Sequence, residues 1–235
     1  MTRSILNRII GGLGLMLLVV SCADNSEVGL LGRAQVLVCN MVPEDDSVTL
    51  YLDTTVVNNS PLSFNELSPY DTLAAGRRSV IVKSYTTDSV VMEKAMYINP
   101  YRNYSFFIVP MDSINKQISL VATVDYLSLP QTMTNAKVRF IHLAPKELGV
   151  NLYTKLDTFT ERKTFTNAYY KTASVFQELK AGKYTLRLTD VQQPENQIST
   201  VTNVVFEQKK SYTILISGLK NSTDYPQQIS VIQNN

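Results

Sequence analysis

A pattern that spans eighteen residues occurs twice in this chain, and this repeat is the feature that most limits the folds available to it. The first copy runs from Ala34 to Tyr51 and the second from Ala136 to Tyr153. In each copy an Ala opens a strand-like run, a Pro follows nine residues later and a Leu-Tyr pair ends the unit, always at an offset of 102 residues. The repeat therefore predicts two units of about 100 residues, each large enough to bury its own core.

The apolar runs within both units predict β-strands. They are short, rich in Val, Ile, Thr, Tyr and Phe, and separated by turn-forming Asn, Pro and Gly. We expect strands at 34–42, 47–52, 79–85, 90–98, 104–110 and 117–125, and at 136–144, 149–155, 162–166, 183–189, 198–206, 211–218 and 227–233. This pattern predicts an all-β fold of two tandem antiparallel β-sandwich domains, 34–126 and 136–235, joined by a linker at 127–135.

The start of the chain predicts export and lipid attachment. Arg3 and Arg8 precede the apolar run 9–20, which is typical of a bacterial export signal over residues 1–21. The end of this segment, 19–22, resembles the bacterial lipobox, which implies lipid on Cys22. The alternative is an ordinary secretory signal in which Cys22 is incidental. We expect residues 22–33 to form a tether and the protein to be held at the outer membrane, on its periplasmic side or at the cell surface.

The second copy also resembles a known family. Residues 142–146, His-Leu-Ala-Pro-Lys, and 179–185, Leu-Lys-Ala-Gly-Lys-Tyr-Thr, are similar to two segments of the bacterial domain-of-unknown-function family 4397. The first copy carries more degenerate versions at 40–44 and 73–79. The resemblance implies two tandem immunoglobulin- or transthyretin-like sandwiches in a Bacteroidetes-type lipoprotein, and it implies no known activity.

Charge and residue chemistry exclude several function classes. Without Arg3 and Arg8 the chain has 20 basic and 20 acidic residues, so it lacks the basic surface expected of a nucleic-acid-binding protein. Its single histidine, His142, lies in an apolar strand beside a turn, where we expect a structural role, and Cys39 reads as a small buried hydrophobe. Residues 44–46, Glu-Asp-Asp, read as a solvated turn because the alternating calcium loop is missing. We therefore expect no cofactor, no metal and no enzymatic activity.

Two groups of tyrosines are the candidate ligand contacts. Tyr97 and Tyr101 flank Asn99-Pro100, and Tyr169 and Tyr170 lie in a long loop of the second unit. Loop tyrosines combine a flat apolar ring with a hydroxyl and suit contact with sugars or proteins. The alternative is that they pack at strand ends.

A recurring triplet in the first unit gives a second set of candidates. Asp-Ser or Asp-Thr followed by an aliphatic residue or Thr occurs five times, a pattern that resembles the acceptor site for general O-glycosylation in Bacteroidetes. The resemblance implies glycans on Ser47, Thr54, Thr72, Ser89 and Ser113. Asp-Ser and Asp-Thr are also common turn starters, and this interpretation stays open.

Three function hypotheses follow. The first is a lipid-anchored cell-envelope protein, non-catalytic, whose two sandwiches bind an envelope protein or a glycan. The second is a glycan-binding accessory of a polysaccharide-uptake system, a hypothesis that the loop tyrosines suggest. The third is a fimbrial or adhesin subunit, in which a cut at Arg33 would free a strand for pairing with a neighbouring subunit.

Overall fold

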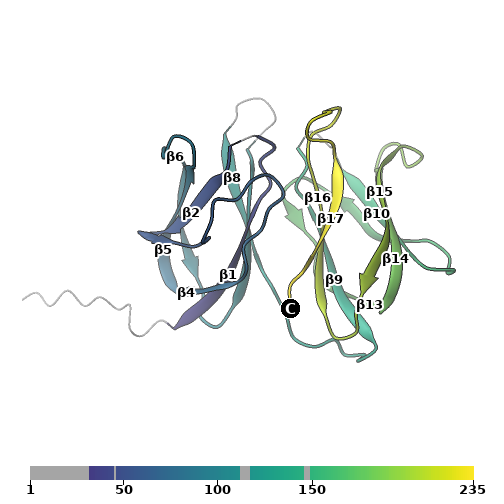
Figure 1. Cartoon of the computed structure of the whole chain (residues 1–235). Helices are drawn as coiled ribbons and strands as arrows, with labels where there is room; N and C mark the ends of the chain where they lie inside the picture. Colours follow the sequence, from purple (N-terminus) through teal and green to yellow (C-terminus); the bar gives the residue numbers. More distant parts are fainter. Residues whose placement is uncertain (1–31, 45, 112–116, 146–148) are drawn as a thin grey trace, which may run out of the picture.

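The chain folds into β-sheet throughout the part that the structure describes. The computed structural model describes residues 32–44, 46–111, 117–145 and 149–235, and every regular element in these ranges is a strand. The strands form four sheets, which Figure 1 shows as two sandwiches side by side. The predicted all-β sandwich fold is confirmed.

The first sandwich consists of an inner sheet, which faces the other sandwich, and an outer sheet. The inner sheet has the strand order β4-β1-β7-β8 and the outer sheet β3-β2-β5-β6. The strands of the inner sheet are β1 (Arg33–Asn40), β4 (Asp71–Ala74), β7 (Asn103–Pro110) and β8 (Ile118–Val124). Those of the outer sheet are β2 (Val48–Leu52), β3 (Thr55–Val56), β5 (Gly76–Ser84) and β6 (Val90–Ile98).

The second sandwich repeats this arrangement. Its inner sheet has the order β12-β9-β16-β17, with β13 also paired to β9, and its outer sheet has the order β11-β10-β14-β15. The inner strands are β9 (Asn135–His142), β12 (Thr172–Ala173), β13 (Gln177–Lys180), β16 (Ser211–Ser217) and β17 (Gln228–Gln233). The outer strands are β10 (Val150–Leu156), β11 (Arg162–Ala168), β14 (Gly182–Asp190) and β15 (Gln197–Phe206).

The repeated stretch forms the equivalent pair of strands in both sandwiches, β1–β2 and β9–β10. It opens in the middle of the inner sheet and crosses to the outer sheet. The opening strand pairs antiparallel on one side, with β4 or β13, and parallel on the other, with β7 or β16. The parallel pair was not expected from the sequence. It arises because the whole outer sheet is built between the two parallel strands, as a parallel connection requires a long crossover.

The Leu-Tyr pair that ends each copy divides its residues between the two faces of the outer sheet. Leu50 and Leu152 are fully buried in the cores of their sandwiches. Tyr51 and Tyr153 point to the other face, because neighbouring strand residues alternate. There Lys83 Nζ lies 5.3 Å from the ring centre of Tyr51, and the Arg187 guanidinium lies 4.3 Å from that of Tyr153. The repeat thus preserves one core contact and one outer-face cation–π contact.

Four short strands were not expected from the sequence, β3, β4, β12 and β13. β4 and β13 have four residues each and form the edge partner of the opening strand in their sandwiches. Each is followed one residue later by the next outer-sheet strand, which begins at Gly76 or Gly182 with φ angles of +105° and +151°. The Ala-Gly pairs therefore mark a sharp passage between sheets, because glycine adopts positive φ without steric cost.

A third apolar cluster joins the two sandwiches. It contains Leu37, Cys39, Met41, Phe107, Val109, Ile141, Leu143, Leu215 and Ile232, which come from both inner sheets. Along β1 and β9, alternate residues point into the sandwich's own core and into this shared cluster. The four central strands are therefore buried on both faces, which explains why their sequences are nearly continuous apolar runs.

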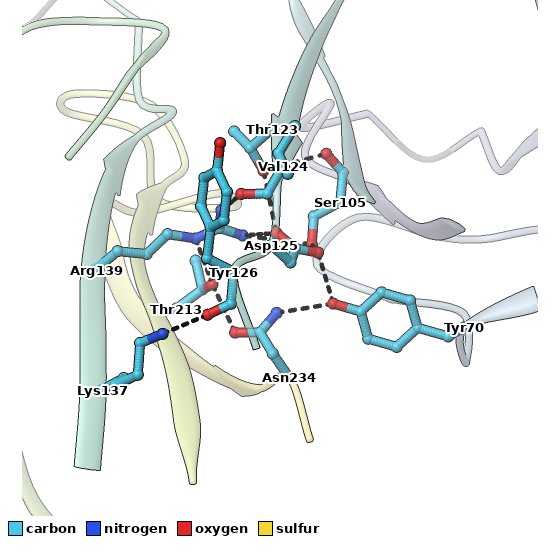
Figure 2. A network of polar contacts seen from close by, with 10 residues as sticks. All are labelled: Tyr70, Ser105, Thr123, Val124, Asp125, Tyr126, Lys137, Arg139, Thr213 and Asn234. Atoms are coloured by element: carbon cyan, nitrogen blue, oxygen red, sulfur yellow. Dashed lines mark hydrogen bonds and ion pairs between the residues drawn. The ribbon is translucent and has the colours of Figure 1, made fainter. Parts of the chain in front are cut away.

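A buried polar network lies beside this cluster and also crosses between the sandwiches (Figure 2). Arg139 of β9 lies with its guanidinium 2.5 Å from the carboxylate of Asp125, which follows β8, and their side chains are 2% and 0% exposed. Asp125 also accepts hydrogen bonds from Tyr70 Oη at 2.6 Å and Ser105 Oγ at 2.8 Å. Arg139 Nε donates to Thr213 Oγ1 at 2.8 Å. Both buried charges are thus paired and hydrogen-bonded, as a dry interior requires.

The two sandwiches are also in contact at the C-terminal ends of their central strands. Ser217 Oγ donates to Asn65 Oδ1 at 2.7 Å, and the Phe64 ring packs edge-on against Tyr225 with centres 5.3 Å apart. Tyr170 Oη donates to the carbonyl oxygen of Pro110, the last residue of β7. The two sandwiches therefore meet along most of the length of their inner sheets.

Candidate functional site

His142 occupies a structural position in the second sandwich. The side chain is fully buried, and Nδ1 accepts a hydrogen bond from the backbone N–H of Ala144 at 3.3 Å. Burial lowers the pKa of His142 to about 4, so the ring is neutral at physiological pH. A buried, neutral imidazole at a strand end has no access to a substrate in solution.

The first sandwich uses Asn40 at the equivalent place. Asn40 Oδ1 accepts from the backbone N–H of Val42 at 3.0 Å, two residues along the chain, as His142 accepts from Ala144. Asn40 Nδ2 also donates to the carbonyl oxygen of Leu62 at 2.9 Å. Asn40 and His142 therefore have the same role, since each accepts a hydrogen bond from the backbone N–H two residues later, where the chain leaves the inner sheet.

Cys39 and the acidic turn at 44–46 also have structural and not chemical roles in the described residues. Burial raises the pKa of the Cys39 thiol, which keeps it protonated and unreactive. Asp46 accepts from Ser84 Oγ at 2.5 Å and Thr86 Oγ1 at 2.7 Å, and these bonds lower the pKa of its carboxyl. Asp45 lies outside the described residues. Within the described ranges, no group of three or more metal-ligating side chains comes together.

The candidate tyrosines lie in two separate places. Tyr101, 85% exposed, and Tyr97, 55% exposed, stand near the start of β7. Tyr169 is 56% exposed, and its neighbour Tyr170 reaches Pro110 at the other end of β7. The structure therefore does not bring the four rings together into one surface. Tyr170 is half-buried, and its hydroxyl helps to hold the sandwiches together.

The triplet residues lie mainly on exposed turns and edges of the first sandwich. Thr54, Thr72 and Ser89 are exposed and Ser47 is half-buried, whereas Ser113 lies outside the described residues. The aspartates before Thr54 and Ser89 have φ angles of +55° and +51°, which are turn conformations. The surroundings are compatible with both the glycan and the turn interpretation.

Each sandwich has a cleft at its open side, where the edges of its two sheets face each other. The second-sandwich cleft, between β10, β11 and β13, has a volume of about 310 Å³. The first-sandwich cleft, between β2, β3 and β4, has a volume of about 400 Å³. The strands that line the two clefts occupy equivalent places in their sandwiches. The clefts are therefore the same feature of the fold, with different side chains in each sandwich.

The clearest difference between the two clefts is at one equivalent position, Arg78 in the first and Tyr184 in the second. In the first cleft, Arg78 donates from Nε to the carbonyl oxygen of Ala74 at 3.1 Å and pairs with Asp53 at 3.2 Å. In the second cleft, Tyr184 donates to the carbonyl oxygen of Lys180 at 2.7 Å, again four residues earlier. The same backbone contact is kept, while a charged pair has been replaced by an aromatic ring. Sequence reasoning missed both clefts, because the strands β4 and β13 that form their walls were not expected.

The described residues contain no helix long and apolar enough to cross a membrane. Cys22, the predicted lipid site, and residues 1–21, the predicted signal, lie outside the described residues, as does the predicted tether apart from residues 32 and 33.

The described residues form a two-sandwich β-protein with one cleft in each sandwich, and sequence comparison gives its family. The model of DUF4397, a domain of unknown function, matches residues 34–153, just over half of the chain. The chain therefore belongs to this family. The match covers the first sandwich and continues through the repeated stretch of the second.

Other comparisons give only distant likeness. No curated protein matches the sequence significantly. Among solved structures, a family 26 carbohydrate-binding module of Eubacterium rectale Amy13K, in complex with maltoheptaose, has 7% identity and a TM-score of 0.27, with 86% of this chain and 97% of that chain covered. A streptococcal virulence factor that binds alpha-glucan has 13% identity and a TM-score of 0.26, with 86% and 97% covered.

Proposed function

We propose that this protein is a lipid-anchored, non-catalytic binding protein of the bacterial cell envelope. Its two sandwiches form one rigid body, held at the outer membrane through lipid on Cys22. The observation that supports the non-catalytic role is the state of its most reactive side chains, since His142 and Cys39 are both buried, one neutral and the other protonated. The joined inner sheets support a role as a stiff module that presents its outer surfaces to partners.

The anchor is tested by fatty-acid labelling in the native host. The wild-type chain should incorporate labelled palmitate and sediment with membranes, and Cys22→Ala should lose both properties. Cys39→Ala is the matched control, because the second cysteine of the chain is buried in the described fold and should not affect labelling. Label retained by Cys22→Ala would show that the lipid is not on this residue.

A glycan-binding accessory role is the first alternative. The high exposure of Tyr101 supports it, because an accessible ring can stack on a sugar. A glycan array should show binding that Tyr101→Ala weakens. An array without signal above background would remove this alternative.

The fimbrial alternative depends on a cut at Arg33. Arg33 is exposed and is the first residue of β1, so a protease could reach it. The remainder of β1 pairs with both β4 and β7, however, and strand exchange would have to extract it from the middle of a sheet. N-terminal sequencing of the mature protein tests this alternative, which requires a chain that starts at Ala34.

A further inference from the structure

The cleft of the second sandwich combines an apolar floor with an exposed aromatic rim. Leu156, Leu179 and the ring of Tyr184 form the floor, and Phe159 lies at the rim with 57% of its surface exposed. A ring of this size left in water beside a concave apolar surface favours a ligand that stacks on it. The volume of about 310 Å³ is that of a small-molecule site.

Hydroxyl groups line the same cleft. Thr154, Thr160 and Thr164 all contribute to its walls, and the hydroxyls of Thr154 and Thr164 lie 2.7 Å apart in a hydrogen bond. An adjoining hollow of about 280 Å³ shares Thr164 and continues along β11. Apolar floor and hydroxyl-bearing walls together match a sugar, which has apolar ring faces and a polar periphery.

The charge of the cleft is positive. Arg162 and Lys180 both line it, and Lys180 Nζ lies 5.5 Å from the ring centre of Phe159. Burial raises the pKa of Tyr184, and the charge of Arg162 opposes this shift. The acidic residue of the cleft, Glu178, accepts hydrogen bonds from the backbone N–H groups of Gln131 and Thr132. These neutral donors leave Glu178 charged, so the cleft has two cations and one anion, and its net charge favours an anionic ligand.

We propose that this cleft binds a sugar unit that carries a carboxylate, with the ring stacked on Phe159 and the carboxylate paired with Arg162. The proposal rests on the binding function proposed above and names its ligand class. The adjoining hollow along β11 would accept the next unit of an oligosaccharide. The equivalent cleft of the first sandwich does not share this property, because the carboxylates of Asp53 and Asp71 balance its two arginines, Arg33 and Arg78.

The test uses the full chain and a panel of trisaccharides of glucuronic, galacturonic, mannuronic and guluronic acid, each with its neutral counterpart. Contact is detected by saturation-transfer NMR and affinity is measured by titration calorimetry. At least one acidic trisaccharide should bind at least about tenfold more tightly than its neutral counterpart. Phe159→Ala and Arg162→Gln should each weaken this binding about tenfold. Both residues are exposed, so these variants should fold normally.

Lys163→Gln is the matched control. Lys163 is the neighbour of Arg162 but lies over Tyr153, on the opposite face of the outer sheet, so affinity should be unchanged. The proposal is overturned if no acidic trisaccharide binds, if acidic and neutral sugars bind equally, or if Lys163→Gln weakens binding as much as Arg162→Gln. None of these results bears on membrane attachment through Cys22, so the failure of the ligand class is distinguishable from the failure of the anchor.

Discussion

At the scale of single residues, the comparison of His142 with Asn40 shows what the repeat keeps. The sequence predicted a structural histidine, since the first copy has asparagine at that position, and the hydrogen bonds to Val42 and Ala144 give the reason. The sequence did not predict that Arg139 is buried at the interface. In the first copy this position is Leu37, and a single arginine in an apolar strand does not reveal its partner when that partner, Asp125, belongs to the other sandwich.

His142 should make the stability of the protein depend on pH. Its pKa is about 4 in the folded protein and its usual value is 6.5, so between these values the unfolded chain binds a proton that the folded chain does not. The contribution is fully present above pH 6.5 and is lost as the pH falls to 4, by about 3 kcal/mol.

Urea unfolding of wild-type protein and His142→Asn at several pH values measures this loss. The difference in unfolding free energy between the two proteins should change across pH 6.5 to 4, in favour of the variant at the acid end. A difference that stays constant over this range would show that His142 titrates normally in the folded state.

The Arg139–Asp125 pair should be costly to break from one side. Arg139→Met leaves the Asp125 carboxylate buried without its cation, and we expect a loss of about 3–5 kcal/mol in the free energy of unfolding. Arg139→Met combined with Asp125→Asn should recover part of this loss, because the stranded charge is removed. Urea unfolding measures both variants. Equal losses of unfolding free energy in the single and double variants would contradict the claim that the unpaired Asp125 carboxylate causes the loss.

At the scale of elements, each sandwich fixes the start of its central parallel strand with a tyrosine. Tyr104 Oη accepts from the backbone N–H of Asn99 at 3.0 Å, and Tyr212 Oη accepts from that of Glu207 at 3.0 Å, in both cases five residues earlier. The sequence predicted both of these strands, at 104–110 and 211–218. It did not predict β4 and β13, because four residues are too few to establish a period and their pairing partner lies far away in the chain.

Removing either tyrosine hydroxyl should have the same modest effect. Tyr104→Phe and Tyr212→Phe each delete one hydrogen bond from a backbone N–H while keeping the ring, so each should cost about 1 kcal/mol. Tyr104→Phe also deletes a longer bond from Asn99 Nδ2 at 3.3 Å, so its cost should be equal or slightly larger. Thermal unfolding of the two variants measures this cost. A large loss in one variant and none in the other would show that the two corners are not equivalent.

At the scale of the whole molecule, the two sandwiches share a core. The repeat predicted two units that each bury their own core, and these cores exist. The sequence also indicated the apolar cluster between the sandwiches. The run Phe106-Phe107-Ile108-Val109 lacks the alternation of apolar and polar residues that a strand with one solvent-exposed face shows. It could not identify the surface that covers the second face, since strand patterns do not specify which sheets meet.

The central claim is that the two sandwiches behave as one body, and calorimetry of the full chain tests it most directly. The shared apolar cluster and the buried Arg139–Asp125 pair should couple their unfolding into a single transition, in which calorimetric and van't Hoff enthalpies agree. Arg139→Met should lower the midpoint of that one transition. Two separate transitions, of which Arg139→Met shifts only one, would contradict the account.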